Sequence, residues 1–170
     1  MPTLTVMVGL PASGKSTYLK FVDDPEFGDT VFVYSTDRYI ESCAQLNGMT
    51  YNEAFDEFIK PATKNMNDLL KIAFRQGVDV FWDQTNMSAK KRAKILRQFP
   101  AHYRKVCVCF VPPQNDDEWA ELQRRLVSRP GKSIPSHIIE SMADSYVQPT
   151  LAEGFDEVKL LDIYAQPINP

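Results

Sequence analysis

A glycine-rich segment near the start of the sequence has the residue types and spacing of a phosphate-binding loop. Gly9 and Gly14 enclose four other residues, and Lys15 and Ser16 follow at once. The glycines accept backbone conformations that allow successive N–H groups to surround a phosphate. A lysine at this position can reach the β- and γ-phosphates of a nucleotide, and the serine hydroxyl can ligate Mg²⁺. The expected ATP-binding residues of the loop are Gly9, Pro11, Ala12, Ser13, Gly14, Lys15, Ser16 and Thr17.

The surroundings of this loop also fit nucleotide binding. The apolar run Leu4–Val8 predicts a buried strand before the loop, and a helix is expected from Ser16 to about Val22. This helix would add the positive end of its dipole to the phosphate site. The sequence has no Asn-Lys-x-Asp segment of the kind that binds guanine in GTPases, and 170 residues are too few for a motor or ring ATPase. A small kinase is therefore the expected class of protein.

Two further polar segments follow predicted strands. Ser35–Tyr39 comes after the strand expected at Val31–Tyr34, and Asp83–Asn86 comes after the strand expected at Val78–Trp82. Ligands of an open α/β sheet bind at the carboxyl ends of its strands. We therefore expect both segments to meet the phosphate loop at one edge of the sheet.

Asp37, in the first of these segments, is the candidate catalytic base. A carboxylate beside the γ-phosphate can orient an acceptor hydroxyl and take its proton during transfer. The alternative is that Asp37 caps the helix that starts near Arg38. The position at a strand end favours catalysis, with Lys15 as the partner on the donor side.

The second segment supplies candidates for the acceptor site. Asp83 ends an apolar run, in the manner of strand-end acidic residues that hold Mg²⁺ through water, although it could equally be a turn residue. Thr85 and Asn86 offer neutral hydrogen bonds to an acceptor, and Asn86 could alternatively form a local turn. The expected acceptor-binding residues are Arg38, Asp83, Thr85, Asn86 and Arg92, and the expected metal ligands are Ser16, Asp37 and Asp83.

A basic segment later in the chain predicts a short mobile lid at about residues 125–135. Arg125 and Arg129 are four residues apart, so they share one face if the helix expected at Trp119–Val127 continues. Two guanidinium groups there can clamp a triphosphate as charge moves toward the leaving oxygen. The alternative is a solvated basic face, which is common at the C-terminal end of a helix. Arg129 is the stronger candidate of the two, and we expect it to be catalytic.

A second basic cluster lies on the helix expected at Ala89–Phe99, for which Ser88 is a suitable cap. Lysines on a helix surface are usually only solvated, and this interpretation holds for most of the cluster. Because the cluster begins beside the candidate acceptor segment, DNA or RNA could pass over it. The cluster consists of Lys90, Lys91, Arg92, Lys94 and Arg97.

These candidate residues need a scaffold in which strands and helices alternate. Apolar residues spaced three and four apart predict a helical stretch over Tyr51–Arg75, with a kink or a new helix at Pro61. The alternation indicates a three-layer α/β fold of the P-loop kinase type, with a central parallel sheet of about five strands and helices on both faces. The other expected elements are helices at Tyr39–Leu46 and Ser136–Tyr146 and strands at Val106–Val111 and Val158–Leu161.

The composition is that of an ordinary globular protein. Of the 170 residues, 44% are apolar and 24% are charged, and no linker divides them, so we expect one domain. The net charge of −3 means that any polyanion must be met by local positive charge. We find no signal segment and no apolar run long enough to cross a bilayer. Three cysteines without zinc spacing are expected to be reduced, which predicts a cytoplasmic protein with no membrane contact.

Together these segments resemble the kinase domain of bacteriophage-type polynucleotide 5′-hydroxyl kinases, within a wider group of small, AAA_33-like phosphate-loop kinases. The resemblance covers nearly the whole chain. It implies that Asp37 activates a 5′-hydroxyl, that Thr85 and Asn86 lie in the acceptor region, and that Arg129 contacts the donor phosphates. It also implies the use of ATP and Mg²⁺, and often assembly as a homo-oligomer. The matching segments are Gly9–Thr17, Asp37-x-Tyr39, Asp83-x-Thr85-Asn86 and Arg125-x-x-x-Arg129-x-x-Lys132-x-x-Pro135.

The sequence departs from this family in three places. Bifunctional relatives carry a phosphatase domain marked by Asp-x-Asp-Gly-Thr, which does not occur here, so a kinase domain alone is expected. Ile40 stands where the family has an acceptor-binding arginine, although Arg38 is close by. Gln84 is an extra residue between Asp83 and Thr85. The donor side of the resemblance therefore transfers to this chain more directly than the acceptor side.

The identity of the acceptor stays open at this point. A 5′-hydroxyl end of DNA or RNA is the leading expectation. The alternatives are a nucleoside, a nucleotide, another small alcohol or a hydroxylated base in phage DNA. A deep closed pocket would favour a small acceptor, and an open basic channel would favour a polymer. A nucleotide-dependent binding protein without transfer activity is a third class, which the presence of Lys15, Ser16, Asp37 and Arg129 opposes.

Overall fold

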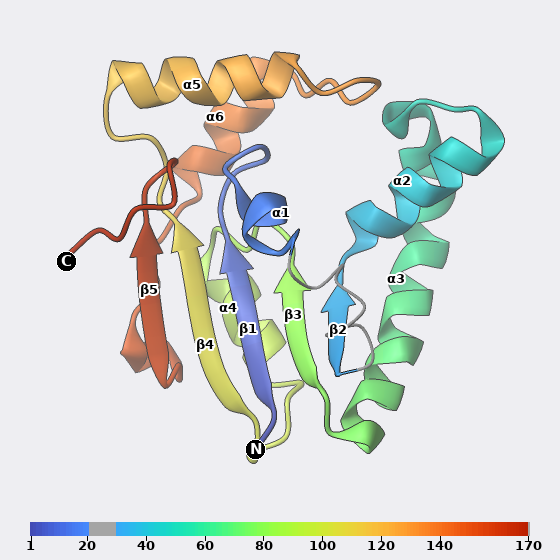
Figure 1. Cartoon of the computed structure of the whole chain (residues 1–170), viewed down its shortest axis with the longest axis vertical. Helices are drawn as coiled ribbons and strands as arrows, with labels where there is room; N and C mark the ends of the chain where they lie inside the picture. The colour runs from blue at the N-terminus through green and yellow to red at the C-terminus, as the bar shows by residue number, and fades with distance from the viewer. Residues whose placement is uncertain (21–29, 170) are drawn as a thin grey trace.

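Five parallel strands form the central sheet of the structure, a computed structural model that describes residues 1–20 and 30–169 (Figure 1). They are β1 (Thr3–Val8), β2 (Val31–Tyr34), β3 (Asp79–Asp83), β4 (Arg104–Phe110) and β5 (Glu157–Leu161). Their order in the sheet is β2-β3-β1-β4-β5, so β1, which leads into the phosphate loop, lies in the middle. Val6 of β1 pairs with Trp82 on one side and with Cys107 on the other.

Apolar side chains cover both faces of this sheet. Along β1, Leu4 and Val6 belong to one hydrophobic core and Met7 to another, and none of the three is exposed. Met66 packs in the first core and Leu19 in the second. Each such buried side chain contributes about 1.5–3 kcal/mol, so both faces add to stability. Helices on both faces of a parallel sheet confirm the predicted three-layer α/β fold.

The helices begin and end near signals that the sequence contains. They are α1 (Lys15–Tyr18), α2 (Thr36–Asn47), α3 (Tyr51–Gln76), α4 (Ala89–Leu96), α5 (Asp116–Val127), α6 (Ser136–Asp144) and the short 3₁₀ helix η2 (Leu151–Glu153). Ser88 caps α4, as predicted, because its hydroxyl oxygen accepts a hydrogen bond from the Lys91 N–H group. Thr50 and Glu53 form a reciprocal capping box at the start of α3.

Two helices begin earlier than predicted because of their caps. The hydroxyl oxygen of Ser35 accepts from the Arg38 N–H group at 3.3 Å, so α2 starts before Tyr39. The side chain of Asn115 accepts from the Glu118 N–H group at 2.9 Å and starts α5 before the predicted limit. Ser and Asn are preferred at this position because their side chains satisfy N–H groups that have no acceptor within the helix.

The long helix α3 runs through Pro61 without interruption, so no new helix begins there. The first helix, α1, ends at Tyr18, before its predicted end near Val22, which itself lies outside the described residues. Among the helices that are described, none is both long and apolar enough to cross a membrane.

The carboxyl ends of the strands lie at one end of the molecule, where the phosphate loop and the starts of α1 and α2 also lie (Figure 1). Helices α5 and α6 lie over this end of the sheet, and the loop between them extends toward α2 and α3 (Figure 1). There the Tyr51 N–H group donates to the carbonyl of Gly131 at 3.1 Å. The fold therefore brings the lid segment to the edge at which ligands of α/β sheets bind.

Candidate active site

The phosphate loop joins β1 to α1, and its geometry requires glycine. Gly14 has a φ angle of 115°, and a Cβ on Gly9 would lie 2.6 Å from the hydroxyl oxygen of Ser13. That hydroxyl is buried and has no hydrogen-bond partner within the described part of the chain. Gly14 supplies no side-chain cap for α1. An unpartnered hydroxyl and uncapped first-turn N–H groups fit the binding of a phosphate.

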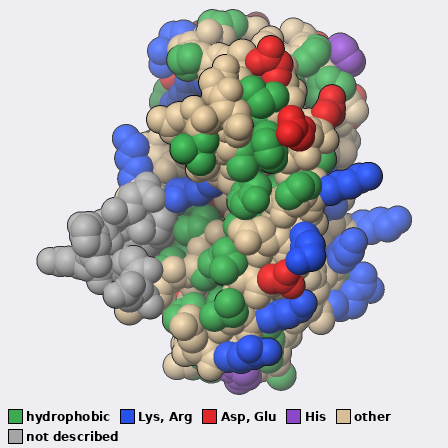
Figure 2. Space-filling model, turned by 90° about the vertical axis from the view of Figure 1, so that its right-hand side faces the viewer, with side chains coloured by type: hydrophobic (Ala, Val, Ile, Leu, Met, Phe, Trp, Pro, Cys, Tyr) green, Lys and Arg blue, Asp and Glu red, His purple; other side chains and the backbone are tan. Residues whose placement is uncertain are grey.

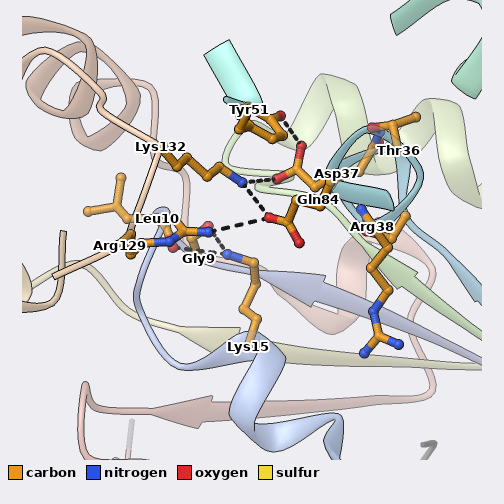
Figure 3. Close-up of polar contacts among 12 residues, drawn as sticks. Gly9, Leu10, Lys15, Thr36, Asp37, Arg38, Tyr51, Gln84, Arg129 and Lys132 are labelled. Atoms are coloured by element: carbon orange, nitrogen blue, oxygen red, sulfur yellow. Dashed lines mark hydrogen bonds and ion pairs between the residues drawn. The ribbon is translucent and has the colours of Figure 1, made fainter. Parts of the chain in front are cut away.

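Lys15 is held inside this loop. Its side chain is largely buried, and Nζ donates to the carbonyls of Gly9 and Leu10, both at 2.9 Å. Burial lowers the pKa of the ammonium group to about 8, although the carboxylates of Asp83 and Asp37 partly oppose this shift. Figure 3 shows the ammonium group pointing toward the same space as Asp37. The lysine is thus placed between the loop and the candidate base.

A cavity of about 470 Å³ lies beside Lys15. It is lined by the phosphate loop, the start of α2, the segment after β3, the start of α3 and the lid segment. Its size suits a small molecule or one terminal unit of a polymer. The predicted site residues that line it are Pro11, Ala12, Lys15, Ser16, Asp37, Arg38, Asp83, Thr85 and Arg129. The structure therefore brings together most of the residues that the sequence indicated.

Asp37 is fixed by two neighbours. Its Oδ1 accepts from the Tyr51 hydroxyl at 2.5 Å, and its Oδ2 accepts from Lys132 Nζ at 3.1 Å. Burial alone would raise the pKa of Asp37, but Lys132 and Tyr51 outweigh this effect and hold the pKa below its usual value. The helix cap is Ser35, so the alternative in which Asp37 caps α2 is wrong. An ionised carboxylate in a fixed orientation suits a base that accepts a hydroxyl proton.

Sequence reasoning gave no role to three side chains around Asp37, namely Glu41, Tyr51 and Lys132. Lys132 Nζ donates to Glu41 Oε1 at 3.2 Å and lies 3.9 Å from the centroid of the Tyr51 ring. Arg129 Nη2 lies 3.9 Å from the same oxygen of Glu41. The sequence contains two features that could have indicated these residues. Glu41 is one helical turn after Asp37, and Lys132 belongs to the basic lid segment.

The end of β3 contributes Asp83, and the next residue, Gln84, forms hydrogen bonds that connect two elements of the site. Burial raises the pKa of Asp83, against the opposing effect of Lys15 and Arg38. Gln84 Nε2 donates to Thr36 Oγ1 at 3.2 Å, and Trp82 Nε1 donates to Gln84 Oε1 at 3.0 Å. The extra residue of this segment therefore ties β3 to the first turn of α2.

The residues suited to Mg²⁺ are Ser16 and Asp83. Both line the cavity at its phosphate-loop end, and Mg²⁺ prefers oxygen ligands. Asp37 fits this role less well, because the ammonium group of Lys132 lies 3.1 Å from its carboxylate and would repel a cation. Within residues 1–20 and 30–169, no three acidic, histidine or cysteine side chains form a metal cluster. A metal held mainly by nucleotide phosphates needs only one or two protein carboxylates.

Thr85 and Asn86 have different surroundings. Thr85 lines the cavity, and its carbonyl accepts from the Gly9 N–H group at 3.0 Å. Asn86 is buried and has a φ angle of 47°. Its Nδ2 donates to the carbonyl of Met7 at 2.8 Å. Asn86 therefore holds the segment against the end of β1, in agreement with the local-turn alternative, and its side chain does not face an acceptor.

The prediction that Arg92 binds the acceptor is wrong, because its side chain is completely buried. Nε and Nη2 donate to the Glu153 carboxylate at 2.8 and 2.7 Å. Nη1 donates to the carbonyls of Asn86 and Met87, and Nη2 also donates to the carbonyl of Val147. These bonds use all five N–H groups of the guanidinium. Arg92 therefore joins α4, the segment after β3 and the C-terminal segment from the inside of the fold.

A second cavity, of about 1080 Å³, is also lined by Lys15. Arg125 lines it and lies against the phosphate loop, since its Nη1 donates to the Ser13 carbonyl at 3.4 Å and its Nε donates to Glu121 at 2.6 Å. Arg129 lines both cavities. The predicted ATP-binding residues along it are Ala12, Gly14, Lys15, Ser16, Thr17, Arg125 and Arg129. The two cavities meet at the phosphate loop and the lid, because both are lined by Lys15, Ser16 and Arg129.

A phosphate loop after the central strand of a five-stranded parallel sheet defines the P-loop kinase fold. Residues 4–149 match the family AAA_33, described as "AAA domain", and the chain belongs to this family.

Solved structures share this fold. A putative kinase from Chloroflexus aurantiacus J-10-fl has a TM-score of 0.64 at 16% identity, covering 95% of this chain and 85% of that one. A chain of the PezAT toxin–antitoxin system of Streptococcus pneumoniae has a TM-score of 0.63 at 15% identity, covering 99% and 70%. A gluconokinase from Sinorhizobium meliloti 1021 has a TM-score of 0.51 at 19% identity, covering 98% and 85%.

Curated relatives are longer than this chain. Heterogeneous nuclear ribonucleoprotein U-like protein 2 of Mus musculus is 28% identical over 174 residues, which cover 97% of this chain and 22% of that protein. L-seryl-tRNA(Sec) kinase of Methanococcus maripaludis is 26% identical over 158 residues, covering 90% of this chain and 56% of that enzyme. The chain thus spans 22% and 56% of the lengths of these two relatives.

Proposed function

We propose that this protein is an ATP-dependent phosphotransferase that phosphorylates a hydroxyl group. One observation carries the proposal: Lys15 of the phosphate loop and the oriented carboxylate of Asp37 line the same cavity. An ionised carboxylate held in a fixed orientation beside the phosphate-binding lysine can accept the proton of an acceptor hydroxyl. Its membership of AAA_33 and its P-loop kinase fold agree with this function.

In the proposed reaction the acceptor oxygen forms a bond to the γ-phosphorus, and the bond from that phosphorus to the β–γ bridging oxygen breaks. Asp37 takes the hydroxyl proton, ADP leaves with the bridging oxygen, and the acceptor becomes a phosphate monoester. Lys15 and Arg129 stabilise the charge that grows on the donor phosphates. Mg²⁺ bound with ATP would neutralise phosphate charge, and Ser16 and Asp83 are the residues that would hold it.

The acceptor that we propose first is the 5′-hydroxyl end of DNA or RNA. The segments that resemble polynucleotide kinases support this choice, because Asp37, Thr85 and Arg129 line one cavity. The seryl-tRNA kinase relative, by its name, also acts on a group carried by a nucleic acid. A cavity of about 470 Å³ would admit one terminal unit of such an acceptor.

A small alcohol is the second candidate, and the walls of the cavity favour it. Apolar side chains line part of the cavity, among them Phe55, Ile134 and Met142. Ile40, in place of the arginine of the polynucleotide kinases, is completely buried. On the face shown in Figure 2, Lys and Arg side chains gather toward the right and the bottom, and no continuous basic stripe crosses the face.

Transfer of label from γ-labelled ATP in the presence of Mg²⁺ tests these proposals. The acceptors are 5′-hydroxyl oligonucleotides, nucleosides, nucleoside monophosphates and small polyols. Labelled oligonucleotides would support the first acceptor, and label in small molecules alone would show that it is wrong. No label in any acceptor would contradict phosphotransfer and favour a nucleotide-dependent binding protein.

The base assignment has its own test. We expect Asp37→Ala to lower the rate of transfer about 10²- to 10⁴-fold, because proton removal loses its catalyst. Asp56→Ala is the matched control, since Asp56 is exposed on α3 and lines neither cavity. Nearly unchanged transfer in Asp37→Ala would show that Asp37 is not the base.

A further inference from the structure

The loop between α5 and α6, residues 128–135, is docked on the start of α3. The Tyr51 N–H group donates to the Gly131 carbonyl at 3.1 Å, and Asn52 Nδ2 donates to the Ser133 carbonyl at 2.9 Å. Gly131 has a φ angle of 66°, a conformation that glycine adopts without strain. These contacts hold the loop closed over the first cavity, whose walls include Ser133.

One side chain of this loop reaches the candidate base. Lys132 Nζ donates to Asp37 Oδ2 at 3.1 Å and to Glu41 Oε1 at 3.2 Å, and it stacks on the Tyr51 ring. The Lys132 side chain is only 7% exposed, so the pair with Asp37 is shielded from solvent on the lysine side. Figure 3 shows Lys132, Tyr51 and Asp37 converging in front of Lys15.

The contacts define the orientation of the Asp37 carboxylate and leave some of its lone-pair sites free. Tyr51 donates to one oxygen of Asp37 and Lys132 donates to the other, which fixes the plane of the group. A carboxylate has about four lone-pair sites, so sites remain for an acceptor hydroxyl. Tyr51 belongs to α3, whereas Lys132 belongs to the loop. The second contact of Asp37 therefore comes from the loop and requires the loop to be docked.

We propose that Lys132 is a positioning residue, which completes the orientation of the Asp37 carboxylate when the loop 128–135 closes. Glu41 holds the second side of the ammonium group and keeps it directed at Asp37. Arg129 lies three residues before Lys132 on the same loop and also lines the second cavity. Closure of the loop around ATP thus places Arg129 at the donor phosphates and, at the same time, Lys132 at the carboxylate of Asp37. The role in catalysis rests on the phosphotransfer proposed above.

Two other roles for Lys132 make different predictions. If Lys132 contacted the transferred phosphoryl group directly, its removal would slow the reaction whether or not Asp37 were present. If the ion pair blocked the base, removal of Lys132 would make the reaction faster. A positioning residue that acts through Asp37 gives a slower reaction, and only when Asp37 is present.

A double-mutant cycle separates these roles. We expect Lys132→Met to lower kcat about tenfold or more, with the KM for ATP changed by less than about threefold. In the Asp37→Ala background the same substitution should lower kcat by less than about twofold. Lys132→Arg retains a charged donor and should lose less than Lys132→Met. Lys60→Met, an exposed lysine on α3, is the control. An unchanged or higher kcat in Lys132→Met, or an equal loss in both backgrounds, would overturn the proposal.

Hydrogen exchange tests the contact without any acceptor. The Tyr51 N–H group is in the first turn of α3, has no acceptor within its helix and bonds to Gly131 of the loop, so its exchange reports loop docking. We expect Lys132→Met and Asp37→Asn each to speed this exchange about threefold or more, and Lys60→Met to leave it unchanged. Unchanged exchange in both variants would overturn the positioning role even if transfer is active. Faster exchange in a protein without transfer would instead contradict the proposed function alone.

Discussion

The donor side and the acceptor side of this site are built in different ways. The donor side is built mainly from one continuous segment, Gly9–Thr17, whose backbone shape follows from its own glycines, and the lid adds Arg125 and Arg129. The acceptor side is assembled from α2, α3, the segment after β3 and the lid loop, and its contact between Lys132 and Asp37 joins residues 95 positions apart. A local segment has little freedom to vary, because each residue shapes its neighbours. In an assembled site single residues can change independently. This is consistent with Ile40 and Gln84, the two positions at which the acceptor side departs from the polynucleotide kinase pattern.

The first prediction breaks the donor side. Lys15→Ala should lower transfer by about 10³-fold or more, because the charge next to the γ-phosphate is lost in a site from which water is excluded. The fold should persist, since the substitution removes only two hydrogen bonds to loop carbonyls. Label transfer at saturating acceptor measures the effect, and Lys20→Ala, an exposed lysine just after α1, is the control. Transfer within about tenfold of the unsubstituted protein would remove Lys15 from the mechanism.

The second prediction concerns the scaffold under the acceptor side. Arg92→Met should destabilise the protein by about 3–5 kcal/mol, because Glu153 loses its cationic partner and three carbonyls each lose one donor inside the fold. Urea unfolding followed by circular dichroism measures this change. Arg97→Met, at an exposed residue directly after α4, should change stability by less than about 0.5 kcal/mol. Equal stability of the two variants would mean that the buried network contributes little.

Arg92 also shows where sequence reasoning reaches its limit. A basic residue among four other cations on a helix indicates a charged surface, and nothing near it in the sequence indicates burial. Its partner Glu153 is 61 positions away, so the pairing exists only after the chain has folded. The same is true of Lys132 and Asp37. By contrast, the phosphate loop and the Ser88 cap depend on neighbours within a few residues, and both were predictable.

The fold was predictable because its signals are periodic. Apolar runs bounded by turn residues placed β2 at Val31–Tyr34, and residues spaced three and four apart placed the long helix α3. Helix starts were less well predicted, since α2 begins three residues before Tyr39. That limit depends on a single hydrogen bond from Arg38 to Ser35, which hydrophobic spacing does not report.

The third prediction tests the residue that both sides share. Arg129 lines both cavities, and its Nη2 lies 3.9 Å from Glu41 Oε1. Arg129→Ala should lower kcat about a hundredfold or more, because the guanidinium stabilises charge on the leaving phosphate. Arg97→Ala, in which an exposed arginine is removed far from the phosphate loop, is the control in the same label-transfer assay. Full activity of Arg129→Ala would favour the alternative in which the lid arginines are only a solvated basic face at the end of a helix.

The last prediction uses pH to separate the two sides. Burial lowers the pKa of Lys15 from 10.5 to about 8, so the free protein loses this positive charge as the pH rises through 8. Because bound phosphates favour the charged lysine, MgATP should bind up to about tenfold more weakly at pH 9 than at pH 7. Lys15→Met has no proton to lose there, so its weaker binding should stay flat over this range. Calorimetric titration measures the affinity of both proteins for MgATP at each pH. The same pH dependence of affinity in both proteins would show that the titrating group is not Lys15.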